Sequence, residues 1–197
     1  MTLIEALLPE WDREMGLTRQ VLTRVPEGRF QWQPHPTSMS LGRLAAHLVD
    51  IPRWAVSSID QNWFEPPPDA ETAPEVETPG AMLARFDANA RAGRAILVGK
   101  TDAELLAPWT RLSGGHEVFT MPKATALRNF VLNHTVHHRG QLTVYLRMLG
   151  VPMPSVYGPS ADASLESHPP SPQASVGKPS HPRTLAPRTS HLPGPLH

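Results

Sequence analysis

Two histidines one helical turn apart, His134 and His138, are the residues of this chain best placed to do chemistry. They lie within residues 123–149, where the spacing of apolar residues predicts a helix. At about 100° per residue, both imidazoles fall within roughly 20° of the centre of the apolar stripe that faces a core. That stripe comprises Leu127, Phe130, Val131, His134, His138, Gln141, Leu142, Tyr145 and Leu149. Because buried imidazoles need polar partners, and i, i+4 spacing lets two of them converge, the pair indicates a metal site.

A third histidine, His47, strengthens this interpretation. It lies on the apolar stripe of another expected helix, for which Ser40 is the predicted N-cap. Inward histidines from two helices are typical of a metal site in a bundle core, and three neutral imidazoles fit a catalytic zinc site whose fourth position takes water or substrate. His47, His134 and His138 are therefore the candidate metal ligands. A hydrogen-bonded cluster of buried histidines is the alternative.

The remaining histidines of the expected helical region do not share this pattern. His137 lies roughly 80° from the centre of the stripe and is left out of the site. His35 and His116 fall in expected loops, where surface positions are predicted. Thr135 stands where the zinc-protease pattern His-Glu-x-x-His requires glutamate, which removes the main support for protease chemistry.

Several other residues near the candidate ligands have two interpretations. Gln141 and Tyr145 either hydrogen-bond a ligand or belong to the core. Asp50 either orients a ligand imidazole or is a solvated surface carboxylate. Gly140 costs a helix interior about 1 kcal/mol relative to alanine, which suggests close packing there. Three aromatic residues are expected in the core, at the end of the bundle or along its pocket: Trp54, Trp63 and Phe64.

The elements that position these residues are predicted to be helices. Helical spacing occurs in residues 2–24, in the segment from Leu41, in residues 79–100 and in residues 123–149. Pro52 is expected to kink or end the second helix. Residues 65–80 are rich in proline and acidic residues and predict a long connection, and residues 109–120 predict a small hairpin or an extended crossover. We therefore predict an all-α fold, a four-helix bundle with a long connection or small hairpin before the last helix.

Composition limits the function. The 197 residues carry a formal net charge of zero and contain no cysteine, which excludes disulfides, thiolate zinc sites, Fe–S clusters and cysteine nucleophiles. The charge balance does not favour nucleic acid. With no apolar run near the roughly 20 residues of a bilayer span, and no leader pattern, a cytoplasmic protein without a membrane partner is expected.

The chain is expected to divide near residue 163. Residues 1–163 carry the predicted helices, whereas residues 164–197 are rich in Pro, Ser and His, which predicts a disordered tail. The four histidines of the tail are left out of the metal site: His168, His181, His191 and His197.

Three segments carry a resemblance to a known family. They are residues 38–48 around His47, residues 132–142 around the histidine pair, and residues 144–162, which include Val151-Pro152-Met153-Pro154. Over residues 1 to about 163 the chain resembles the DinB family, DinB/YfiT-like four-helix metal proteins. The resemblance implies that His47, His134 and His138 form the family's metal triad. Members of the family are often dimers, and some relatives are transferases or isomerases that use a low-molecular-weight thiol.

The sequence and the resemblance together predict a divalent-metal-binding protein with a three-histidine site. The leading hypothesis is a metal-dependent enzyme of the hydrolase or thiol-dependent transferase type, acting on a small molecule such as a low-molecular-weight thiol, with a homodimer as the expected assembly. Zn²⁺ or Ni²⁺ is the favoured cofactor, although imidazole ligands also suit copper and iron. The alternatives are a non-catalytic metal-binding stress-response protein and an interaction module that works through its Pro-rich tail.

Overall fold

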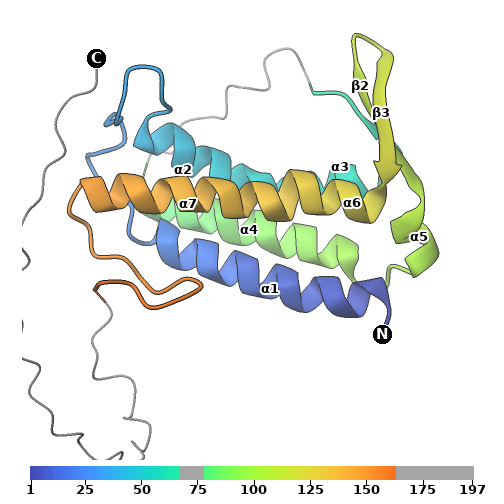
Figure 1. Ribbon diagram of the computed structural model, residues 1–197, viewed down its shortest axis with the longest axis horizontal. Coiled ribbons are helices and arrows are strands. Elements are labelled where there is room, and N and C mark those ends of the chain that lie inside the picture. Colours follow the sequence, from blue (N-terminus) through green and yellow to red (C-terminus); the bar gives the residue numbers. More distant parts are fainter. Residues whose placement is uncertain (67–77, 163–197) are drawn as a thin grey trace, which may run out of the picture. The chain divides into compact units, whose positions relative to one another are not determined.

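The computed structural model of the chain describes residues 1–66 and 78–162. The predicted disordered tail and most of the predicted connection at residues 65–80 lie outside these ranges. The longest helices are α1 (Leu3–Leu22), α2 (Leu41–Asp50), α4 (Pro79–Leu97) and α7 (Asn133–Met148), as Figure 1 shows. Shorter helical elements are η1 (Ile51–Arg53), α3 (Trp54–Ile59), α5 (Asp102–Leu106), α6 (Lys123–Leu127) and η2 (Arg128–Leu132).

Local sequence explains where the long helices begin and end. Thr2 and Glu5 form a capping box at the start of α1, and the side chain of Ser40 accepts the first-turn N–H of Arg43 in α2, as predicted. Pro52 ends α2 and introduces the 3-10 turn η1 before α3. Helices α1 and α2 each pack against both α4 and α7. The core between them is built from aliphatic and aromatic side chains, including Leu7, Trp11, Leu44, Leu48, Phe86, Leu142 and Leu146.

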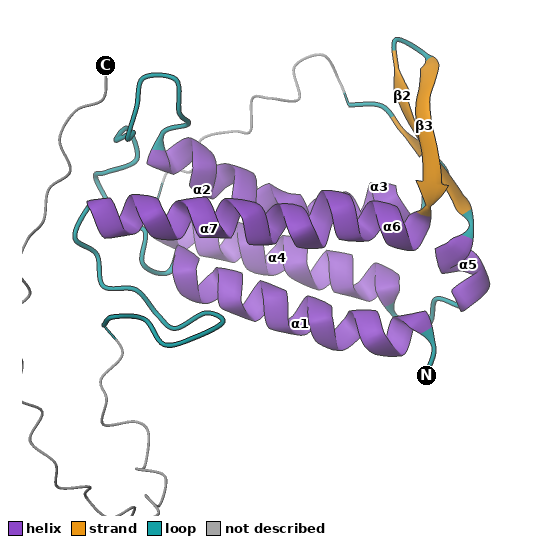
Figure 2. Cartoon of the chain, viewed as in Figure 1, coloured by secondary structure: helices purple, strands orange, loops and turns teal. Residues whose placement is uncertain are grey.

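A three-stranded mixed sheet accompanies the helices (Figure 2). Strands β2 (Pro108–Ser113) and β3 (His116–Pro122) form the expected hairpin, and β1 (Trp63–Phe64) pairs parallel to β2. The hairpin turns at Gly114 and Gly115, whose φ angles of 59° and 76° suit glycine in a tight two-residue turn. The prediction of an all-α four-helix bundle is therefore wrong, because the described residues contain this sheet and more than four helices. Residue 63 reaches β2 through a parallel pairing that no local pattern encodes.

The last helical segment is not a uniform α-helix. Between α6 and α7 the chain forms a π-helical turn, η2, in which the N–H of Asn133 bonds to the carbonyl of Arg128, five residues back. The extra residue changes the register between residues 123–127 and α7. Phe130 is consequently only half-buried, whereas Leu132 and Thr135 are buried.

The expectation of close packing at Gly140 is wrong, and another glycine has that role. A Cβ at Gly140 would meet no atom within 4 Å. At Gly93 in α4, a Cβ would lie 2.6 Å from ring carbons of Trp11 and 2.8 Å from the carbonyl oxygen of Pro52. Glycine at position 93 is therefore what allows α4 to approach α1 and η1 so closely.

Candidate metal centre

The three histidines selected from the sequence come together between α2 and α7. The Nε2 atoms of His47 and His134 lie 3.2 Å apart, and those of His134 and His138 lie 2.7 Å apart. One ring nitrogen from each side chain lies within 4.8 Å of the other two. Helix α7 supplies two rings because positions 134 and 138 follow the π-helical turn and keep α-helical spacing. Helix α2 supplies the third through its contact with α7.

The electrostatic surroundings keep these rings neutral. Burial, followed by the neighbouring histidines, lowers the pKa of His47 from 6.5 to about 4. Burial also lowers the pKa of His134 to about 4, and it lowers that of His138. All three imidazoles are therefore uncharged near pH 7 and can offer a lone pair, which is the form that binds a metal ion.

The donor set and its spacing fit a divalent ion. Nitrogens bound at 2.0–2.1 Å in a tetrahedral arrangement lie roughly 3.3 Å from one another. The His47–His134 separation of 3.2 Å is close to that value, and the His134–His138 separation of 2.7 Å requires a small outward movement. The three ring nitrogens, all within 4.8 Å of one another, could thus hold a metal ion here.

Groups around the cluster hold its rings in place. The Nδ1 atom of His138 lies 2.7 Å from Oε1 of Gln141, and His134 is hydrogen-bonded to the backbone of Phe130 in η2. The ring of Trp54 lies 5.4 Å from the ring of His47, edge to face, and 5.3 Å from that of His134. Of the two interpretations of Gln141, the structure favours contact with the site over burial in the core, since its side chain is exposed.

Asp50 has neither of its expected roles. Its carboxylate accepts two hydrogen bonds from Arg85, at 3.1 and 2.8 Å, and a longer one from Asn89. The side chain of Asp50 is only 11% exposed, so it is not a solvated surface group. It joins α2 to α4, because both of its partners lie on α4.

The other aromatic candidates contribute to packing away from the ligand atoms. Tyr145 is half-buried and meets Trp32 edge to face, with ring centroids 5.6 Å apart. Trp63 is 56% exposed, so it does not belong to the core. Phe64 is half-buried beneath the guanidinium of Arg111, 5.8 Å from the ring centroid.

The histidines left out of the site lie on the surface. His137 is exposed, although its ring centroid is 4.8 Å from that of His138. His35 and His116 are exposed, as expected for both. The separation of His134 and His138 from their neighbour His137 therefore follows the predicted helical directions.

A buried ion pair beside the site escaped the sequence analysis. Arg139, the residue after His138, is 2% exposed and donates to the Glu14 carboxylate at 2.6 Å. It also donates to the carbonyl oxygen of Glu14, to the hydroxyl of Thr18 and to the hydroxyl of Tyr157. The helical spacing of α1 could have indicated that Glu14 faces inward, but its partner is 125 residues away.

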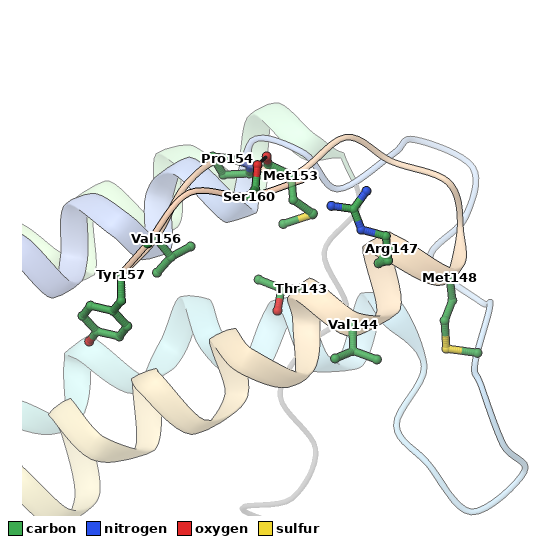
Figure 3. A pocket seen from close by; sticks show the side chains of 10 residues that line it. Thr143, Val144, Arg147, Met148, Met153, Pro154, Val156, Tyr157 and Ser160 are labelled. Carbon is green, nitrogen blue, oxygen red and sulfur yellow. Dashed lines mark hydrogen bonds between the residues drawn. The ribbon is translucent and has the colours of Figure 1, made fainter. Parts of the chain in front are cut away.

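A separate groove lies between α7 and residues 153–160 (Figure 3). Its volume is about 400 Å³, and its walls are largely apolar, with Val144 and Met148 on the helix and Val156 and Tyr157 opposite. None of the three clustered histidines lines it.

Within the described part of the chain, every helix is too short or too polar to cross a bilayer.

Comparisons with known proteins agree with this architecture. The chain is 27% identical over 163 residues to the uncharacterized protein YrdA of Bacillus subtilis (strain 168), covering 81% of this chain and 90% of YrdA. The crystal structure of a DinB-like protein from Bacillus cereus ATCC 10987 superposes with a TM-score of 0.62 at 26% identity, over 79% of this chain and 98% of that one. The DinB-like protein YjoA from Bacillus subtilis shares the fold, with a TM-score of 0.60 at 19% identity over 78% of this chain and 98% of that one. The sequence profile of the DinB family matches residues 1–169, and the chain therefore belongs to the DinB family.

Proposed function

We propose that this protein is a metal-dependent enzyme that holds one divalent ion, Zn²⁺ or Ni²⁺, on His47, His134 and His138. The observation that carries the proposal is the convergence of three neutral imidazoles through their Nε2 atoms. Membership of the DinB family supports it.

Each residue of the site has a separate task in this proposal. His134 and His138 supply two ligands from the single helix α7, and His47 supplies the third from α2. Trp54 packs against the rings of His47 and His134. A bound divalent ion supplies Lewis acidity, which lowers the pKa of a water or thiol that reaches the open position.

The reaction class that we propose is hydrolysis or group transfer to a low-molecular-weight thiol. Since the chain has no cysteine, a thiol nucleophile must arrive as a cosubstrate. The absence of the His-Glu-x-x-His pattern leaves Thr135 where a zinc protease carries its general base. A small-molecule substrate is therefore favoured over a peptide bond.

Metal content of the full-length protein tests the site. After incubation with Zn²⁺ or Ni²⁺ and removal of unbound ion, wild type is expected to retain about one ion per chain more than the double variant H134A/H138A. The matched control is His116→Ala, which removes an exposed histidine of β3 and should retain the wild-type amount. Every variant keeps the histidines of residues 164–197, so weak binding there cancels in the comparison. Equal metal content in wild type and the double variant would refute the site.

Catalysis requires a second experiment. Metal-loaded wild type is incubated with glutathione, bacillithiol or mycothiol and an electrophile, or with ester and amide substrates alone. Turnover that disappears in His47→Ala and persists in His116→Ala would support the enzyme. Metal binding without turnover of any of these substrates would instead favour a non-catalytic metal-binding protein.

A further inference from the structure

We propose that Gln141 is a positioning residue of the metal site, because its amide oxygen accepts the Nδ1–H of His138 and so directs the Nε2 lone pair of that ring toward His47 and His134. This inference rests on the proposed function. It assigns a role to a side chain that is exposed and binds no metal itself.

The direction of the hydrogen bond follows from the atoms involved. The Nδ1 atom of His138 lies 2.7 Å from Oε1 of Gln141. A carbonyl oxygen carries no proton, so the ring nitrogen must be the donor. A neutral imidazole with its proton on Nδ1 has its lone pair on Nε2. That Nε2 is the atom 2.7 Å from Nε2 of His134, so the contact with Gln141 selects the tautomer whose lone pair lies on the nitrogen nearest the other histidines.

Helical spacing explains why position 141 can do this. Residues 138 and 141 are three apart on α7, so their side chains are neighbours on one face of the helix. His134 has a comparable contact, since its ring is hydrogen-bonded to the backbone of Phe130 in η2. A side-chain substitution cannot remove that backbone group. Of these two hydrogen-bond partners of the ligand histidines, only Gln141 can therefore be tested by mutation.

The choice of an amide also has a chemical consequence. A carboxylate at position 141 would accept the same hydrogen bond and would add a negative charge. That charge would make Nε2 of the imidazole a stronger electron-pair donor to a metal ion. Glutamine fixes the orientation and leaves the charge of the ion uncompensated. A change from glutamine to glutamate at this position therefore alters the charge beside His138 while it keeps an acceptor for Nδ1–H.

Three variants separate this role from a structural one. Gln141→Leu removes the hydrogen-bond acceptor, and Gln141→Glu keeps one. The control, Gln20→Leu, makes the same glutamine-to-leucine change at an exposed position of α1, away from the site. Zn²⁺ affinity is measured on the full-length proteins by competition with a chromophoric chelator. Because Gln141→Leu removes the hydrogen-bond partner of a ligand histidine, this variant is expected to bind Zn²⁺ about 10- to 100-fold more weakly. Gln141→Glu should bind Zn²⁺ at least as tightly as wild type, and Gln20→Leu should match wild type.

The outcomes distinguish this inference from the proposed function. Wild-type affinity in Gln141→Leu would overturn the positioning role and leave the three-histidine site intact. Equal weakening in Gln141→Leu and Gln141→Glu would also overturn it, because an acceptor alone would not restore binding. Wild type that binds Zn²⁺ no more tightly than the double variant H134A/H138A would refute both the site and the role of Gln141. Urea denaturation of the metal-free proteins checks that each variant is folded.

Discussion

Replacing Glu14 with glutamine should greatly destabilise the protein, although the two side chains have nearly the same shape. Glu14 and Arg139 form an ion pair of 2.6 Å whose side chains are 7% and 2% exposed. Glutamine keeps an oxygen that can accept from Arg139, but it removes the negative charge. The guanidinium would then stay buried between α1 and α7 without a counter-ion.

The burial of the pair sets the size of the effect. Removing one partner of a buried ion pair costs about 3–5 kcal/mol, because the remaining charge loses both water and its partner. The ion pair of Asp12 and Arg94 is the natural comparison, since Asp12 is two residues away on α1 and its pair is 49% and 45% exposed. An exposed pair contributes little to stability, because water screens its charges. Glu14→Gln should therefore cost several times more stability than Asp12→Asn.

Urea denaturation of the full-length variants at neutral pH measures these differences. A double variant, Glu14→Leu with Arg139→Met, supplies the decisive comparison. Replacing a buried ion pair with apolar residues of similar volume is often neutral or stabilising, so this variant should recover most of the loss seen in Glu14→Gln. If Glu14→Gln and Asp12→Asn have the same free energy of unfolding, or if the double variant is the least stable of all, the reasoning from burial is wrong.

Two further predictions concern helical glycines and pH. Gly93→Ala should destabilise the protein by about 1–3 kcal/mol because its Cβ would collide with Trp11. Gly140→Ala should stabilise the protein by up to about 1 kcal/mol because its Cβ would meet no atom within 4 Å. Equal effects of the two substitutions in urea denaturation would contradict the packing argument. In the metal-free protein, His47 and His134 have pKa values of about 4 when folded and 6.5 when exposed. The unfolded chain then binds more protons between these values, so their contribution to stability is complete above pH 6.5 and is lost as pH falls toward 4. From pH 7.5 to 4, the urea midpoint should fall more steeply for wild type than for the double variant with His47→Gln and His134→Gln. The same pH dependence in both proteins would contradict the prediction.

The clustering of the histidines could be predicted because it depends on local spacing. His134 and His138 both lie within α7, where one helical turn separates them. His47 needed only an inward-facing position on a neighbouring helix. The prediction did not need the exact register of residues 123–132, where the π-helical turn η2 moves Phe130 toward the surface. No residue pattern in that segment predicts the π-helical turn.

The other features that escaped prediction are contacts between distant segments. The Asp50–Arg85 ion pair joins two helices whose separation in space is set by the whole core. The pairing of Trp63 with Thr110 adds a parallel strand of only two residues, too short to show an alternating pattern. Such contacts depend on tertiary geometry, and they are the reason that an all-α fold was expected where a mixed sheet exists.

The adjacent residues His138 and Arg139 show how the fold aims its candidate ligands. Successive side chains on a helix point about 100° apart, and α7 packs against both α1 and α2. Arg139 is held toward α1 by Glu14, which leaves His138 directed toward α2 and His47. A rotation of α7 that moved His138 away from the cluster would also pull a buried guanidinium from its carboxylate. The ion pair that stabilises the helices therefore also restricts the direction in which the histidines point.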